Sequence, residues 1–302
     1  PVEFFGQGLV VFGAESGEAK VVDAFCPHMG AHLGYGIREQ TGKGPRIVGD
    51  SIECPFHGWR WNGEGQCTHI PYANNLPPRV AKGESILGAW QVREVNQQIL
   101  VWYHPNKEAP TWEPEVIPEA AANHPDWGDI IIHTWEINTH MQEMGENAVD
   151  AAHFHYVHGT DEVPEAAFQN FDGHIREGKF ITRQPTPRGV VDGAIETRSQ
   201  GAGLSVVRFT GIYDTLLLAN VTPVGPEKTY ATYAFIQPRA TQDTLGKTVG
   251  QAIIGNICQQ MAEDQIIWDR KQYFDRPLLC DGDGPFAKFR RWFSQFLIEP
   301  AA

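Results

Sequence analysis

Two short segments each bring a cysteine and a histidine close together in the sequence. The first contains Cys26 and His28, and the second contains Cys54 and His57. Each segment follows residues with the composition of a β-strand, so each is expected to form a loop at the end of a strand. Thiolates and imidazoles are side chains that bind transition metals well. The four residues therefore predict a metal site shared by two loops.

Three interpretations of these pairs remain open from the residues alone. Zinc would take all four ligands on one tetrahedral ion, whereas a Rieske cluster would take two cysteines on one iron and two histidines on the other. The third interpretation is two unrelated cysteines with histidines nearby by chance. The unequal C-x-H and C-x-x-H spacings favour the Rieske cluster, because zinc ribbons repeat C-x-x-C. Pro27 and Pro55 stiffen the loops, and Gly30, Gly58 and Gly63 allow close approach of the backbone.

A second group of metal-binding residue types lies in segment 140–158, which has few helix breakers and predicts a helix. At about 100° per residue, His153 lies about 60° to one side of Asp150 and His158 about 80° to the other. All three can then face one centre, whereas His155 points elsewhere. Two histidines and a carboxylate form the facial triad that binds Fe(II). The alternative is a histidine-rich face that is solvated or packed in the core.

The third ligand is expected from a long helix predicted over residues 245–274. Three apolar residues mark one face of this helix: Ile257, Met261 and Trp268. Asp264 lies on the same face, where a carboxylate is costly unless it is paired or binds a metal. We therefore predict Asp264 as the ligand, with a buried ion pair or a misjudged helix face as the alternative. Glu263 and Asp269 lie off this face, and we expect them to be solvated.

The elements around these residues indicate two domains. Short β-type segments separated by glycine and proline predict a small antiparallel β domain over residues 1–115. A proline-rich connector at 105–128 leads to a strand, the helix at 140–158, several β-rich segments and the long helix. Strands followed by helices, rather than strict alternation, predict an α+β domain with an antiparallel sheet over residues 116–302.

Composition argues against several functional classes. The 302 residues contain 24 Lys plus Arg and 37 Asp plus Glu, a net charge of −13, so nucleic acid is not an expected partner. No segment has the run of about 20 apolar residues of a membrane-spanning helix, and no signal peptide is recognisable. Five cysteines do not make a disulfide framework in a chain of this length, which favours a reducing compartment.

Taken together, these motifs resemble the oxygenase component of Rieske non-haem iron oxygenases. Within that family the chain is most similar to the 3-ketosteroid 9α-hydroxylases and the Neverland-type cholesterol 7-desaturases. The resemblance lies in the two Cys–His loops, in Glu146 through His158, and in segments that begin at Asp264 and Arg290. It implies an N-terminal all-β Rieske domain, followed by an α+β catalytic domain with an antiparallel sheet flanked by helices.

The resemblance also implies a role for each candidate residue. Four residues would bind the [2Fe–2S] cluster: Cys26, His28, Cys54 and His57. Three would bind the mononuclear iron: His153, His158 and Asp264. Asp150 would hydrogen-bond both His153 and a cluster histidine, His57, of a neighbouring subunit in a head-to-tail homotrimer. Asn147 would lie beside the iron.

The implied activity is that of a monooxygenase. O2, with electrons from NADH passed through a separate flavin and iron–sulfur reductase, would hydroxylate a C–H bond of a steroid or sterol. Desaturation and oxidation of a sterol methyl group on the same scaffold stay open. From other classes, the alternatives are a Rieske electron-transfer protein without oxygenase activity and a zinc-stabilised lipid-binding protein. An electron carrier would not need the ligands His153, His158 and Asp264.

Two features depart from the family pattern. The 25 residues between His28 and Cys54 exceed the usual number in the steroid hydroxylases, and the extra piece around 38–45 is predicted to be a surface loop. The Neverland-type enzymes carry a membrane anchor ahead of the first strand. We expect a cytoplasmic protein, or a membrane-associated one if such a segment precedes Pro1.

Overall fold

The computed structural model describes residues 1–36, 46–186, 189–239 and 244–299. The described chain forms two compact units, Pro1–Val116 and Ile117–Glu299. The surface loop predicted around 38–45 lies outside the described residues.

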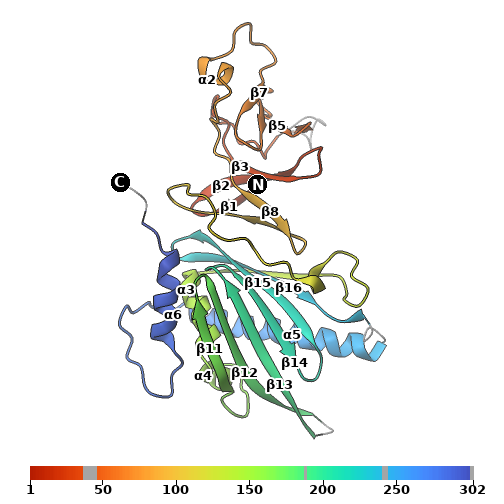
Figure 1. Cartoon of the computed structure of the whole chain (residues 1–302), viewed down its shortest axis with the longest axis vertical. Helices are drawn as coiled ribbons and strands as arrows, with labels where there is room; N and C mark the ends of the chain where they lie inside the picture. Colours follow the sequence, from red (N-terminus) through yellow and green to blue (C-terminus); the bar gives the residue numbers. More distant parts are fainter. Residues whose placement is uncertain (37–45, 187–188, 240–243, 300–302) are drawn as a thin grey trace. The chain divides into compact units, whose positions relative to one another are not determined.

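The first unit is built from short strands in three antiparallel sheets (Figure 1). The first sheet contains β1 (Val2–Phe4), β2 (Gln7–Gly13) and β3 (Ala19–Asp23). The second contains β4 (Arg46–Val48), β5 (Ser51–Glu53), β6 (Arg60–Asn62) and β7 (Cys67–His69). The third pairs β8 (Val92–Val95) with β9 (Gln98–Val101), and the short helix α2 spans Pro78–Ala81.

The core of this unit contains both predicted cluster cysteines. Cys26 and Cys54 are buried together with Val22, Leu33 and Trp61. Strands β4 and β5 form a hairpin, in which Arg46 pairs with Glu53. Cys54 therefore follows β5 directly, as Cys26 follows the end of β3 closely.

The second unit contains one seven-stranded antiparallel sheet with the order β10-β16-β15-β14-β13-β12-β11 (Figure 1). Its strands are β10 (Ile131–Ile137), β11 (Glu165–Asp172), β12 (Ile175–Thr186), β13 (Gly189–Gln200), β14 (Leu204–Thr210), β15 (Thr215–Gly225) and β16 (Lys228–Ile236). Its helices are η1 (Pro118–Ala120), α3 (Met141–Glu146), η2 (Asn147–Val149), α4 (Ala152–Tyr156), α5 (Thr244–Trp268), α6 (Phe286–Phe293) and η4 (Ser294–Phe296). An all-β unit followed by an α+β unit confirms the predicted fold class.

Side chains of the central strands alternate between two layers, because successive residues of a strand point to opposite faces. Leu217 packs against Ile254 and Ile257 of α5. Its neighbours Leu216 and Leu218 belong to a different cluster, on the other face of the sheet. Helix α5 thus covers one face of the sheet (Figure 1), and its C-terminal half carries the predicted ligand Asp264.

The helix predicted over residues 140–158 is broken at Asp150. Helices α3 and η2 precede the break, Asp150 is extended (φ −97°, ψ 109°), and α4 begins at Ala152. Oδ1 of Asp150 accepts hydrogen bonds from the backbone N–H groups of Ala152 (2.9 Å) and His153 (3.2 Å). An N-cap aspartate starts a helix in this way. Asp150 was therefore the sequence signal for a new helix rather than for a continuous one.

Strands β11 and β13 were not predicted from the sequence. Strand β11 is the edge of the sheet and is mostly exposed, so its residues need no regular apolar alternation. Strand β13 includes Gly189, Asp192 and Gly193, which are uncommon in strands. Both segments are ordered by pairing with β12 rather than by their own composition.

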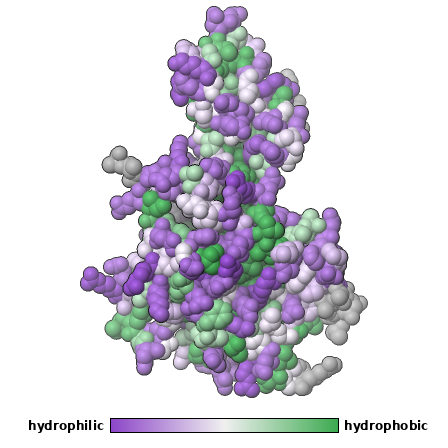
Figure 2. Space-filling model, in the orientation of Figure 1, coloured by the Kyte–Doolittle hydropathy of each residue, from purple (hydrophilic) through white to green (hydrophobic). Residues whose placement is uncertain are grey.

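Hydrophilic side chains predominate on the face of the molecule in Figure 2, in agreement with the high content of acidic residues. Among the helices of the described residues, none is long and apolar enough to cross a lipid bilayer.

A buried ionic cluster joins α3 to the C-terminal elements. Arg290 of α6 donates to both carboxylate oxygens of Glu146, at 2.6 and 3.2 Å, and the Glu146 side chain is only 3% exposed. Lys271 pairs with Glu143, and its Nζ lies 3.8 Å from Oε2 of Glu146. Helix α3 is thereby fixed to the end of α5 and to α6.

We predict that Arg290→Met lowers the free energy of unfolding of the second unit by about 3 kcal/mol, because Glu146 would stay buried without its main partner. Arg291→Met, at an exposed position of the same helix, should change it by less than about 0.5 kcal/mol. Urea unfolding followed by tryptophan fluorescence measures both variants. Equal free energies of unfolding for Arg290→Met and Arg291→Met would show that the ion pair does not hold α3 in place.

Candidate functional site

The two Cys–His loops close in the same way. The carbonyls of Cys26 and Cys54 accept hydrogen bonds from the N–H groups of Gly30 (2.9 Å) and Gly58 (3.0 Å). Each cysteine N–H donates to the carbonyl of the residue after that glycine, at 2.9 and 2.7 Å. Gly30 and Gly58 have φ of +74° and +72°, a conformation that favours glycine. The loops are therefore matched turns, each presenting one sulfur and one imidazole.

The histidine and cysteine side chains of these loops lie close together and are available to bind a metal. The rings of His28 and His57 lie 4.8 Å apart, and Nδ1 of each is buried without a hydrogen-bond partner among the described residues. Buried nitrogens of this kind are costly unless something binds them. The Trp61 indole donates to Sγ of Cys26 at 3.3 Å. The hydrogen bond between the two thiols lowers the pKa of Cys54 and raises the pKa of Cys26, so Cys54 is the first of the pair to become a thiolate.

A single zinc ion would bind all four loop residues in one tetrahedron, whereas a Rieske cluster would place the two sulfurs on one iron and the two imidazoles on the other. Within the described residues, a separate group of three potential ligand atoms lies within 4.8 Å of one another, and it does not include the cysteines.

That closely spaced group consists of His153, His158 and Asp264, the three ligands predicted for the second site. His153 lies in α4, His158 lies just beyond its end, and Asp264 lies in α5. Their side chains are only 11%, 2% and 13% exposed, respectively. The structure therefore brings together two imidazoles from α4 and the residues after it and one carboxylate from α5, in a largely buried place.

Hydrogen bonds determine which nitrogen each imidazole presents. Nδ1 of His153 lies 2.8 Å from the backbone carbonyl of Asp150, which can only accept, so this nitrogen carries the proton. Nδ1 of His158 lies 2.9 Å from Oε2 of Glu263. Nε2 is therefore the nitrogen that each ring leaves for another partner, and Nε2 of His158 lies 3.4 Å from Oδ1 of Asp264. This is the arrangement of a metal-binding histidine whose other nitrogen is held by an acceptor.

The pKa values of the two histidines are shifted in opposite directions. Burial lowers the pKa of His153, more than the carboxylates of Asp264 and Asp150 raise it. Burial also opposes protonation of His158, but hydrogen bonds to Asp264 and Glu263 outweigh it, so the pKa of His158 is raised. The carboxylates thus create a local negative potential that favours a cation between the ligands.

Asn147 and Asp150 both lie beside this group. Nδ2 of Asn147 donates to Oδ2 of Asp264 at 2.9 Å and so holds the carboxylate. The contact from Asp150 to His153 runs through the backbone carbonyl, whereas Oδ2 of Asp150 is 3.9 Å from Nδ1 of His153. The carboxylate is turned away because its Oδ1 caps α4.

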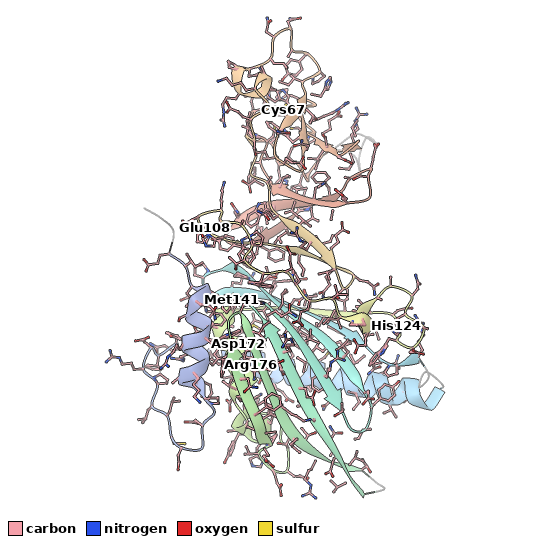
Figure 3. All side chains as sticks on the ribbon, viewed as in Figure 1. Cys67, Glu108, His124, Met141, Asp172 and Arg176 are labelled. Carbon is pink, nitrogen blue, oxygen red and sulfur yellow. The ribbon has the colours of Figure 1, made fainter. Side chains whose placement is uncertain are left out.

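Close packing holds the segment that contains Asp150. Gly284 lies against Val149, and a Cβ at position 284 would be 1.7 Å from the carbonyl oxygen of Val149. On another side, Arg176 of β12 is fully buried and donates to the carbonyl of Ala148 and to Oε1 of Gln169. Burial lowers the pKa of Arg176 to about 10. Figure 3 labels Arg176 on the sheet.

The sequence alone does not predict the contacts that Glu263 and Arg176 make at the site. The expectation that Glu263 is simply solvated is wrong, because its carboxylate binds the ring of His158. Asp269 is also bonded, accepting the N–H of Asn138 at 2.8 Å. The sequence feature that points to Glu263 is its position directly before the predicted ligand Asp264. Arg176 gave no local signal, because its burial depends on the pairing of β11 with β12.

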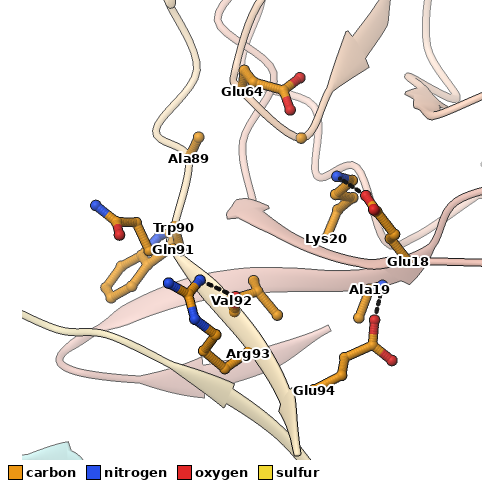
Figure 4. Close-up of a pocket in the computed structure, with 11 residues that line it drawn as sticks. Glu18, Ala19, Lys20, Glu64, Ala89, Trp90, Gln91, Val92, Arg93 and Glu94 are labelled. Carbon is orange, nitrogen blue, oxygen red and sulfur yellow. Dashed lines mark hydrogen bonds and ion pairs between the residues drawn. The ribbon is translucent and has the colours of Figure 1, made fainter. Parts of the chain in front are cut away.

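The first unit also has an open pocket that does not involve the Cys–His loops. Figure 4 shows its lining, which includes Glu18, Lys20, Glu64, Arg93 and Glu94. None of the residues predicted to do chemistry lines it.

Both parts of the chain match known protein families. Residues 1–82 match the Rieske [2Fe-2S] domain, and residues 101–297 match the 3-ketosteroid 9alpha-hydroxylase C-terminal domain. The chain is 33% identical to a 3-ketosteroid-9-alpha-monooxygenase oxygenase component of Rhodococcus rhodochrous, over 99% of this chain and 78% of the relative. It is 31% identical to the cholesterol 7-desaturase nvd of Xenopus laevis, over 96% of this chain and 66% of the relative.

Solved structures show the same fold at lower sequence identity. Dicamba monooxygenase bound to dicamba has a TM-score of 0.74 at 17% identity, over 97% of this chain and 91% of that one. NdmA of Pseudomonas putida CBB5 with caffeine has a TM-score of 0.73 at 18% identity, over 97% of this chain and 83% of that one. With the two domain matches and the close relatives, the chain belongs to the Rieske non-haem iron monooxygenases, in the group that carries the 3-ketosteroid 9α-hydroxylase C-terminal domain.

Proposed function

We propose that this chain is the terminal oxygenase that uses O2 to hydroxylate a C–H bond of a steroid or sterol. In this proposal four residues bind the [2Fe–2S] cluster: Cys26, His28, Cys54 and His57. Three bind the mononuclear iron: His153, His158 and Asp264. The observation that carries the proposal is the convergence of ligand atoms from His153, His158 and Asp264 within 4.8 Å, in a unit that matches the hydroxylase domain.

When bound, the mononuclear iron would supply activation of O2, and the cluster would supply single electrons. The protein's part is to hold the ligands and shape the site. Two histidines and one carboxylate leave several coordination positions open for O2 and for a substrate beside it. Asn147 keeps the Asp264 carboxylate in one orientation.

Apolar residues flank Asp264 on α5. Met261 and Trp268, one turn before and after it, belong to a buried apolar cluster with Ile137 and Ala231 of the sheet. Tyr233 packs at the edge of that cluster. This packing keeps water from that side of the ligand group, while the proposed substrate class rests on the names of the relatives.

The electrons are proposed to come from NADH through a separate flavin and iron–sulfur reductase. One oxygen atom would enter the C–H bond, and the other would leave as water with two electrons and two protons. The name "oxygenase component" of the relatives supports a separate electron-supplying protein.

We also propose that Asp150 links the iron site to His57 of a neighbouring subunit in a head-to-tail homotrimer. Among the described residues, Oδ2 of Asp150 has no hydrogen-bond partner, although Oδ1 caps α4. Apolar side chains are exposed around the cluster loops, including Phe25, Met29 and Phe56. Exposed apolar groups around a redox centre are typical of a docking surface.

Desaturation of a sterol is the second candidate, favoured by the likeness to cholesterol 7-desaturase. It would use the same residues and differ in which C–H bonds lie over the iron. The electron-carrier alternative is less favoured, because it has no use for the group of His153, His158 and Asp264.

His153→Ala should lower the iron content from three to two per chain, because the mononuclear ligand set loses an imidazole. His155→Ala is the matched control on the same helix, since His155 bonds the carbonyl of Thr160 instead. Iron and acid-labile sulfide are measured on both proteins. Three irons in the His153→Ala protein would rule out the proposed ligand set.

Asp150→Asn should keep both metal centres and reduce turnover by roughly 100-fold. Asparagine is as good an N-cap as aspartate, so the fold of α4 is preserved, but the charge that faces the neighbouring subunit is lost. Visible absorption and iron content serve as the control for assembly, and turnover is measured with the reductase and NADH. A variant as active as the native protein would contradict the proposed link.

The proposed activity itself is tested by turnover of a mixed panel of sterols and steroids with a generic reductase and NADH. Mass spectrometry should find one added oxygen atom for hydroxylation, or the loss of two hydrogens for desaturation. Consumption of O2 without modification of any sterol or steroid would overturn the substrate class.

A further inference from the structure

Two consecutive residues of α5 hold opposite sides of one histidine ring. Oε2 of Glu263 lies 2.9 Å from Nδ1 of His158, and Oδ1 of Asp264 lies 3.4 Å from its Nε2. The His158 side chain is only 2% exposed. The ring therefore cannot rotate without breaking both contacts.

The second oxygen of Glu263 is also held. Gln259, one turn earlier on α5, donates from Nε2 to Oε1 of Glu263 at 3.1 Å. Residues four apart lie on the same face of a helix, so this pair fixes the Glu263 side chain. The result is a chain of hydrogen bonds from Gln259 through Glu263 to His158.

The two histidines of the site are supported differently. Nδ1 of His153 donates to a neutral backbone carbonyl, whereas Nδ1 of His158 donates to a carboxylate. A carboxylate acceptor fixes the tautomer and makes the opposite nitrogen a stronger ligand. His158 lies beyond the end of α4, so it needs support that the helix does not give.

We propose that Glu263 is a positioning residue that orients His158 and strengthens metal binding at the site. This inference rests on the proposed function, because it assumes that His153, His158 and Asp264 bind a metal. Glu263 does not touch the metal in this proposal and acts only through the imidazole of His158.

The test is metal affinity of the protein that carries its cluster. The mononuclear metal is removed with a chelator, and Fe(II) or Co(II) is titrated back under anaerobic conditions. Glu263→Gln keeps a hydrogen-bond acceptor but loses the charge, and its dissociation constant should rise roughly 10-fold. Glu263→Ala loses both, and the rise should approach roughly 100-fold. The absorption bands of bound Co(II) should shift in both variants.

Asp269→Asn is the matched control, since Asp269 bonds the backbone of Asn138 and neither histidine. It should bind metal as the native protein does, and circular dichroism should show that all three metal-free variants are folded. Native affinity and Co(II) bands in Glu263→Ala would overturn this inference. Failure of the native protein itself to bind metal at this site would instead overturn the proposed function.

Discussion

The structure depends on holding three electron-rich ligand atoms close together. The ligand atoms of His153, His158 and Asp264 lie within 4.8 Å of one another in a largely buried place. Polar groups that are buried to this extent need hydrogen-bond partners, and these partners fix the orientation of each ligand. A backbone carbonyl restrains His153, Glu263 restrains His158, and Asn147 restrains Asp264.

The rest of the second unit positions these restraints. Apolar contacts fix α5 on the sheet, which places Glu263 and Asp264. The ion pair of Glu146 and Arg290 fixes α3, from which η2 and α4 continue. Gly284 packs against Val149 and Arg176 donates to the carbonyl of Ala148, in the short segment η2 between α3 and α4. The break in the helix also contributes, because the extended Asp150 has its carbonyl oxygen 2.8 Å from Nδ1 of His153.

The sequence identifies the candidate ligands, because their types and spacing are local features. C-x-H, C-x-x-H and the spacing from Asp150 to His158 lie within single segments, and Asp264 lies on an apolar helix face. The sequence does not predict features that depend on distant partners. Glu263 becomes important only when α4 ends beside α5, and β11 and β13 form only by pairing with β12. The continuous helix over residues 140–158 was wrong because the capping role of Asp150 outweighed the helical pattern around it.

In the proposed function, one chain holds a two-iron cluster and a separate single iron. Anomalous diffraction at the iron absorption edge, from crystals of the iron-replete protein, distinguishes the two sites. We expect a paired peak at the loops of Cys26 and Cys54, and a single peak among His153, His158 and Asp264. Iron at the loops, with none among the two histidines and the aspartate, would contradict it.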